Sequence, residues 1–232
     1  AVSSEPALAA VRSEAAFAAI RAEASLGFFP SVQDLAELTK VRVALLVLFT
    51  TMAGFILASR LQGAPIDFWL LLSTVLGTFL VAGSASALNQ VLEKDRDARM
   101  MRTRNRPLPA GRVSPQAATL LGGALAAAGL WILAARTNRV AAAIAAITWG
   151  AYVFVYTPLK ARTHLSTVVG AVPGALPPLI GWTAAGGILG GPAYGLFGIL
   201  FFWQLPHFLA IAWLHREDYA RGGFPLLAVT DP

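Results

Sequence analysis

The sequence predicts an all-α polytopic membrane protein, and three observations support this fold class. Hydrophobic residues make up 56% of the chain and charged residues only 13%, and the mean hydropathy is +0.64, whereas soluble domains carry about 25% charged residues. The charges gather in short groups, and the uncharged intervals between them approach the roughly 20 residues of a membrane-spanning helix. Groups rich in Lys and Arg alternate with groups that hold few, which is the pattern of loops on opposite sides of a membrane.

The uncharged intervals predict six membrane-spanning helices. We expect five of them near residues 43–59, 68–92, 117–135, 140–156 and 194–214. The remaining one, fifth in order, contains Gly170, Pro173, Gly174, Pro177, Pro178 and Gly181. It should bend or break, and the freed backbone groups are tolerated in a membrane only beside a cavity or packed protein.

The cations predict the orientation of the chain. With the N-terminus in the cytoplasm, all 18 Lys and Arg residues except Arg60, Arg136 and Arg139 fall on the cytoplasmic side. The net charge of +6 is therefore interpreted as a topology signal and not as a nucleic-acid-binding surface. The chain has no cysteine, which excludes disulfides and thiolate metal sites. Residues 1–27 lack the apolar core of a signal peptide. We expect a cytoplasmic extension over residues 1–34 and a membrane domain over 35–232.

A dense group of charges follows the second predicted helix. Asn89, Glu93 and Asp97 are spaced four residues apart, which confines them to an arc of roughly 80° on an α-helix. Asp95 lies roughly 240° from Asn89 and should point elsewhere. One helix face at a membrane boundary is thus predicted to carry an amide and two carboxylates.

Two further cytoplasmic segments should meet this face. One contains Tyr156, Lys160 and Arg162, and the other contains Asp218 and Tyr219. The three segments offer oxygen ligands and no cysteine. Such a set suits Mg²⁺, which binds through one or two carboxylates and substrate phosphates. Arg102 and Arg106, with the cations of the second segment, are suited to bind phosphate oxygens. The apolar bundle beneath could hold an isoprenyl tail, so the pattern predicts ionisation of an isoprenyl diphosphate at its allylic carbon.

Simpler interpretations of these residues stay open at this point. The carboxylates could belong to a solvated helix end, and Arg102 and Arg106 could bind lipid head groups. His207, in mid-membrane after a proline, could be a structural hydrogen-bonding residue or a functional one. His215 is better explained as an interfacial residue at a helix end.

The combination of motifs resembles the UbiA-type intramembrane prenyltransferases, in the form found in their heme-farnesylating branch. The first signature is Asn89-x3-Glu93-x3-Asp97 followed by Met101-Arg102-Thr103-x2-Arg106-Pro107-Leu108-Pro109. The resemblance covers about residues 35–232 and continues through Leu38-Thr39-Lys40, Tyr156-Thr157-Pro158-Leu159-Lys160, the Gly- and Pro-rich run from Val169 to Trp182, Trp203-Gln204-x-Pro206-His207-Phe208 and Asp218-Tyr219-x2-Gly222-Gly223.

The resemblance implies a reaction and a set of site residues. A farnesyl group would pass from farnesyl diphosphate to a vinyl group of heme B, with addition of water, to give heme O. The catalytic residues and Mg²⁺ ligands would be Asn89, Glu93, Asp97 and Asp218. The substrate-binding residues would be Arg102, Arg106, Lys160 and Arg162 for phosphate, Tyr156 and Tyr219 beside them, and His207 for heme. Membrane lipid and heme-handling or terminal-oxidase assembly proteins would be the partners, at a bacterial inner membrane.

The sequence departs from the family pattern in two respects. Val41 stands where the family commonly has proline, a change that should not affect the chemistry. The family has nine crossings, so the six present here would be part of a larger bundle, and we expect this chain to be inactive without the remaining helices.

Two rival functions remain. A UbiA-type enzyme acting on an aromatic or quinone precursor typically shows a second Asp-rich cluster, whereas this chain has His215-Arg-Glu-Asp218-Tyr219. A membrane transporter or channel could use the broken fifth helix and His207 as a pathway, but it would not need oxygen ligands clustered at one membrane face.

Overall fold

The computed structural model describes residues 30–230, and these residues form helices and no strand. Most of the predicted extension over 1–34 lies outside the described residues. Its last part enters the first described helix, α2 (Val32–Leu38), which crosses the expected boundary at residue 35.

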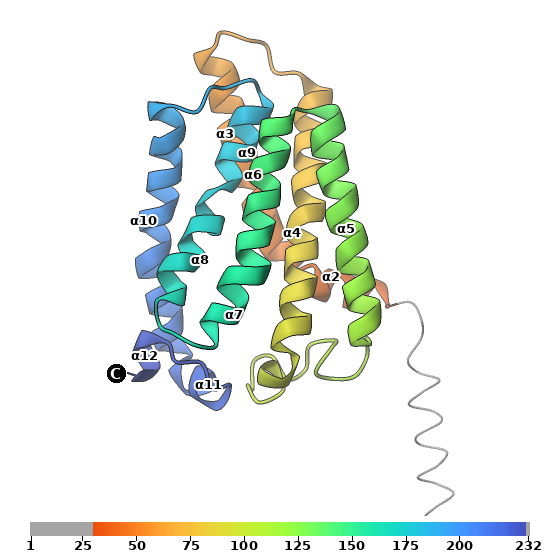
Figure 1. Cartoon of the computed structure of the whole chain (residues 1–232), viewed down its shortest axis with the longest axis vertical. Coiled ribbons are helices and arrows are strands. Elements are labelled where there is room, and N and C mark those ends of the chain that lie inside the picture. Colours follow the sequence, from red (N-terminus) through yellow and green to blue (C-terminus); the bar gives the residue numbers. More distant parts are fainter. Residues whose placement is uncertain (1–29, 231–232) are drawn as a thin grey trace, which may run out of the picture.

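The structure confirms the six membrane-spanning helices. They are α3 (Val41–Leu61), α4 (Phe68–Asp97), α5 (Pro115–Arg136), the continuous run of α6 (Arg139–Gly150), η1 (Ala151–Tyr156) and α7 (Thr157–Lys160), the pair α8 (Ser166–Ala175) and α9 (Pro177–Ala184), and α10 (Gly191–Leu214). Two short helices follow, α11 (Arg216–Arg221) and α12 (Leu227–Thr230). Figure 1 shows the long helices standing side by side as one bundle.

Side-chain caps fix where three of these helices begin. Asp67, Ser114 and Asn138 accept hydrogen bonds from the backbone amides three residues ahead, at 3.0, 3.1 and 2.9 Å. Each cap satisfies one of the amides that the first helical turn leaves without a partner. Asn138 also donates to the carbonyl of Thr183 at 2.6 Å, which ties the start of α6 to the end of α9.

The fifth crossing is broken, as its composition predicts. α8 ends at Ala175 and α9 begins at Pro177, so the break lies at Leu176. Pro177 and Pro178 occupy the first positions of α9, where the missing amide hydrogens cost least. Every residue of α9 is buried, in agreement with the rule that irregular backbone at membrane depth must be covered by protein.

The core of the bundle lies where α9 packs between α3 and α6. Its buried residues are Phe55, Val81, Leu133, Ala141, Ile144, Ala145, Leu179, Ile180 and Ala184. Gly54 and Gly181 allow the backbones of α3 and α9 to touch: a Cβ on Gly54 would overlap the carbonyl oxygen of Pro178, and one on Gly181 the carbonyl oxygen of Thr51. Small residues permit such close approach between membrane helices.

The charged motifs gather at a single end of the bundle. In Figure 1 the C-terminal end of α4, the helix α7 and the helix α11 all lie at the lower end, together with the loop over residues 98–114. The three segments expected on one membrane side are therefore neighbours in the fold.

The contact between α3 and α9 leads to a stability prediction. Gly54→Ala and Gly181→Ala should each lower the stability of the protein in detergent by about 1–3 kcal/mol, because the added methyl group meets backbone that cannot move aside. Gly123→Ala in α5 is the matched control, since a Cβ there meets nothing within 4 Å. Thermal unfolding measures the effect, and equal unfolding midpoints in all three variants would contradict the packing argument.

Candidate active site

The polar face predicted for α4 exists and is buried. Asn89 is 3%, Glu93 4% and Asp97 0% exposed, whereas Asp95 is exposed. Since carboxylates are costly to remove from water unless they are paired, this face requires cations.

Each carboxylate has a cation from a different segment of the chain. Lys160 of α7 donates to both oxygens of Glu93 at 3.1 Å. Arg106 of the loop over residues 98–114 donates to Oδ2 of Asp97 at 2.7 Å. The Oδ1 atom of Asp97 is buried and has no hydrogen-bond partner, so one carboxylate oxygen remains free to bind something further.

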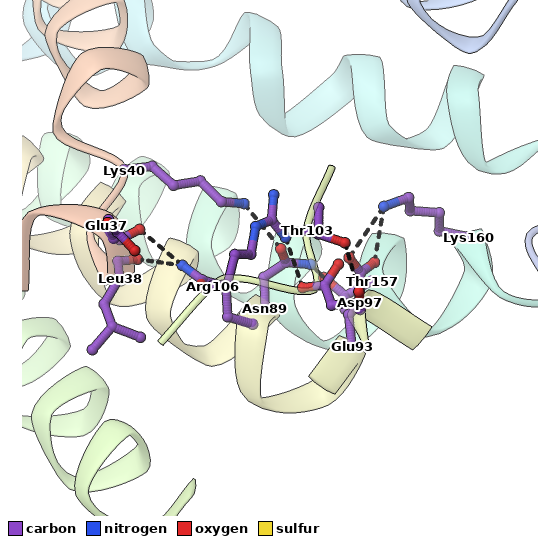
Figure 2. Close-up of polar contacts among 11 residues, drawn as sticks. Glu37, Leu38, Lys40, Asn89, Glu93, Asp97, Thr103, Arg106, Thr157 and Lys160 are labelled. Atoms are coloured by element: carbon purple, nitrogen blue, oxygen red, sulfur yellow. Dashed lines mark hydrogen bonds and ion pairs between the residues drawn. The ribbon is translucent and has the colours of Figure 1, made fainter. Parts of the chain in front are cut away.

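Lys40 is a third cation at the site, and the sequence analysis gave it no role. Its ammonium donates to Oδ1 of Asn89 at 3.1 Å. Figure 2 shows Lys40 and Lys160 reaching the polar face of α4 from opposite sides. Removal of the Lys40 ammonium from water, followed by the charge of the nearby Arg106 guanidinium, lowers the pKa of Lys40 to about 8. No signal in the sequence separates Lys40 from Arg42, which lies nearer to the first predicted crossing.

The backbone of Lys40 makes this reach possible. Lys40 is the only described residue other than glycine with a positive φ, at 48°, and it forms the turn between α2 and α3. A left-handed conformation is unfavourable for a residue with a Cβ. Gln90 supports the turn by donating to the carbonyls of Glu37 and Leu38 at 3.0 and 2.9 Å.

A π-helical turn brings the fourth crossing to the same face. Thr157 directly follows η1. Its hydroxyl donates a hydrogen bond to the carbonyl of Tyr152 at 2.9 Å and accepts one from Nδ2 of Asn89 at 3.2 Å. Asn89 is therefore held from both ends of its amide, by Lys40 and by Thr157. Single π-helical turns are frequent at functional sites, but this one could not be recognised from residue spacing.

Asp218 lies at the site in a different way from that expected. Its Oδ1 accepts from the amide of Met101 at 3.0 Å and from Arg221 at 2.6 Å, and its Oδ2 accepts from the amide of Arg102 at 3.1 Å. The Arg221 guanidinium, followed by the two amides, lowers the pKa of Asp218 to about 2. Among residues 30–230 the structure gathers no three His, Cys, Asp or Glu side chains in a position to hold a metal ion.

Aromatic rings complete the surroundings of Lys160. The rings of Tyr219 and Phe224 are buried, with centroids 5.7 and 4.4 Å from the Lys160 ammonium. Arg96 lies 5.3 Å from the Phe224 ring and Arg102 lies 5.9 Å from the Tyr219 ring. The faces of aromatic rings attract cations, so Tyr219, expected at the site, is joined there by Phe224, which was not.

Two predicted residues, Arg162 and His207, lie apart from this cluster. A third, Tyr156, lies near Glu93 and Tyr219. Arg162 is exposed and has no ion pair within the described residues. His207 lies on the exposed side of α10, stacked on Trp203 at 4.7 Å. Tyr156, half-buried, packs on Tyr152 with centroids 5.2 Å apart and faces Gly170. His215 forms the junction of α10 and α11, consistent with an interfacial residue.

A second polar contact holds the far end of the loop over residues 98–114. Arg112 donates to Asp34 and Glu37 of α2, both at 2.8 Å, and to the carbonyl of Asn105 at 2.9 Å. A hydrogen bond from Ser31, followed by the Arg112 guanidinium, lowers the pKa of Asp34. The loop that carries Arg102 and Arg106 is therefore fastened to α2 as well as to Asp218.

The comparisons with known proteins agree with this fold. The model of the UbiA prenyltransferase family matches residues 47–231. The chain belongs to this family. It resembles a solved digeranylgeranylglyceryl phosphate synthase with a TM-score of 0.71 and 18% identity, covering 86% of this chain and 68% of that one. It also resembles a UbiA homolog from Archaeoglobus fulgidus that was solved with GPP and Mg²⁺. The TM-score is 0.69 and the sequence identity 16%, over 86% of this chain and 70% of that one. These likenesses confirm the predicted UbiA-type helical bundle.

Two curated relatives of this family member carry the name protoheme IX farnesyltransferase. The one from Solibacter usitatus (strain Ellin6076) is 45% identical over 212 residues, which are 87% of this chain and 71% of the relative. The one from Anaeromyxobacter dehalogenans (strain 2CP-C) is 49% identical over 197 residues, 85% and 65% of the respective chains. The chain thus spans about two thirds of the length of these relatives.

The Asp34–Arg112 contact should make stability depend on acid pH. Because the folded pKa of Asp34 lies below its ordinary value of 3.8, the contact stabilises the fold above that value and is lost as the pH falls through the folded pKa. Asp34→Asn should therefore lower the thermal midpoint at about pH 6, and this deficit should shrink as the pH falls below 3.8 and through the folded pKa. Asp95→Asn, a change at an exposed carboxylate, is the control, and a pH-independent deficit in Asp34→Asn would refute the ionic origin.

Proposed function

We propose that this chain carries the diphosphate-binding and ionising part of a protoheme IX farnesyltransferase, with residues 35–232 as its membrane prenyltransferase domain. The observation that carries the proposal is the buried set of two carboxylates and an amide on α4, surrounded by Lys40, Arg106 and Lys160. Such a set is suited to an anion with a bound divalent cation at the mouth of an apolar bundle.

The donor set fits Mg²⁺. Asn89, Glu93 and Asp97 offer only oxygen ligands, and the free Oδ1 of Asp97 is a buried acceptor that lacks a donor. These three residues would hold the ion, with the remaining positions taken by diphosphate oxygens and water. When bound, Mg²⁺ supplies positive charge that stabilises the departing diphosphate. Asp218 is not included in this set, because backbone amides of another segment donate to both of its oxygens, whereas the donors on Glu93 and Asp97 are long side chains that can turn toward phosphate.

The cations of the chain would bind and orient the diphosphate. Lys160 and Arg106 now neutralise Glu93 and Asp97, and a metal bound to those carboxylates would leave both cations free to donate to phosphate oxygens. Lys40 is the additional cation from the start of α3. Donors fixed before the reaction stabilise charge as it develops on the leaving group.

The proposed reaction transfers the farnesyl group to heme B and adds one molecule of water. The bond between C1 of the farnesyl group and the diphosphate oxygen breaks, and the electron pair leaves with the diphosphate. The terminal vinyl carbon of heme B attacks C1, which forms the new carbon–carbon bond and leaves a cation beside the porphyrin ring. Water adds there and loses a proton, which gives the hydroxyethylfarnesyl group of heme O.

The relatives support heme over an aromatic or quinone acceptor, because their printed name specifies heme. His207 keeps its proposed role as a heme contact, since an exposed ring stacked on Trp203 offers a flat aromatic surface at membrane depth. Arg162, exposed at the same end as Lys160, is proposed to reach phosphate only when substrate is bound.

The charge distribution supports an orientation for this integral membrane protein. We infer that the N-terminus and the polar end of the bundle face the cytoplasm at a bacterial inner membrane, because among residues 30–230 that end carries all Lys and Arg residues but Arg60, Arg136 and Arg139.

Substitution of Asp97 tests the diphosphate site. Asp97→Asn should weaken Mg²⁺-dependent binding of farnesyl thiodiphosphate, an unreactive substrate analogue, by at least about tenfold, because one charged ligand is lost. Asp95→Asn is the matched control on the same turn of α4, and binding should be unchanged because Asp95 is exposed. Isothermal titration in nanodiscs measures both, and equal losses in the two variants would sink the assignment of the buried face.

The acceptor is tested by mass analysis of heme. Membranes with this chain, or with a chimaera in which the rest of the Solibacter usitatus relative follows residue 230, are incubated with heme B, farnesyl diphosphate and Mg²⁺. The chimaera should yield heme enlarged by a farnesyl group and water, and Asp97→Asn in the chimaera should abolish it. Unchanged heme from a chimaera that binds the analogue would exclude heme as acceptor.

A further inference from the structure

The carboxylate of Asp218 is occupied by the backbone of another segment. It accepts hydrogen bonds from two consecutive amides, those of Met101 and Arg102, at 3.0 and 3.1 Å, one on each oxygen. Arg221 donates to Oδ1 at 2.6 Å. The side chain is largely buried, with 8% of the residue exposed. A carboxylate that accepts three donors has little capacity left for a metal ion.

The surrounding contacts join the same two segments. Met100 is 1% exposed and packs with Tyr219, Phe224 and Leu226 from the region of α11 and α12. Arg96, at the end of α4, donates to the carbonyl of Gly223 at 2.7 Å. Apolar packing and two sets of polar contacts therefore hold the segment 215–226 against the start of the loop over residues 98–114.

The segment held by Asp218 contains a proposed phosphate ligand. Arg102 follows Met101 directly, and its guanidinium lies 5.9 Å from the Tyr219 ring, next to Asp218 in the chain. Fixing the amide of Arg102 fixes the point from which its side chain extends. Loop residues 101, 102, 104 and 105 are exposed. Local hydrogen bonds from the amides of Thr103 and Arg104 to the carbonyl of Met100 shape this turn. The bonds to Asp218 tie residues 101 and 102 to another segment.

The geometry points to Asp218 as a positioning residue, which holds the loop over residues 98–114 through its backbone amides so that Arg102 faces the diphosphate site, and not as a ligand of Mg²⁺. The effect of this role on diphosphate binding rests on the proposed function. The contact between Asp218 and the loop does not depend on that function. The low pKa of Asp218 agrees with it, because an ionised carboxylate is the form that accepts from several donors.

Proteolysis tests the loop contact without reference to catalysis. The full chain is placed in nanodiscs, which leave both membrane faces accessible, and trypsin cleavage after Arg102 and Arg104 is followed by mass spectrometry. Asp218→Asn should raise the cleavage rate by about tenfold, because charge-assisted hydrogen bonds to the loop are lost. Glu217→Gln, an exposed neighbour on α11, should cleave like the wild type. An unchanged rate in Asp218→Asn would overturn the proposal.

Metal dependence separates positioning from ligation. Binding of farnesyl thiodiphosphate is titrated with Mg²⁺, with the analogue at ten times each variant's own Kd. Asp218→Asn should raise the Kd about tenfold but leave the half-saturating Mg²⁺ concentration within about twofold of wild type, whereas Glu93→Gln should raise that concentration. A rise in Asp218→Asn equal to that in Glu93→Gln would identify a metal ligand and overturn the proposal. A wild-type chain that binds no analogue would overturn the proposed function, and proteolysis would still decide the loop contact.

Discussion

The burial of Glu93 and Asp97 at the end of a membrane bundle is the constraint on which the surrounding structure depends. A buried carboxylate is costly without a paired cation, and the two cations come from segments that follow in the chain, Lys160 from α7 and Arg106 from the loop after α4. Satisfying the two charges therefore draws separate crossings together. The same pairs hold these cations beside the proposed ligands of Mg²⁺, so the groups proposed to bind the metal and the diphosphate already lie together.

The positive charges of the site are also fixed by contacts with backbone. Lys40 leaves a left-handed turn that Gln90 supports, and the loop that carries Arg106 is held at both ends, by Asp218 and by Asp34 with Arg112. Long cationic side chains have many rotamers, and much of their freedom is removed only if the backbone beneath them is fixed. The ends of the loop thus contribute to a site that they do not touch.

Much of the fold and part of the site could be predicted from the sequence. Membrane helices follow from apolar length, the break in the fifth follows from consecutive prolines, and the burial of Asn89, Glu93 and Asp97 with the exposure of Asp95 follows from helical spacing. Lys40, Thr157 and the contacts of Asp218 could not be predicted, because they depend on a left-handed residue, a π-helical turn and the packing of distant segments. Residue spacing predicts which side chains share a helix face only where the backbone is a regular α-helix.

The π-helical turn has a consequence for how the fourth crossing lies along α4. Trp149, before the turn, donates to Ser84 at 2.9 Å, and Thr157, after it, meets Asn89. In an uninterrupted α-helix two positions eight residues apart differ by roughly 80° around the axis, so the second would lie toward the edge of the side that faces α4. The wider turn takes back about one residue of rotation. A single helix can thereby keep one side on its neighbour from the apolar middle of the bundle to its polar end.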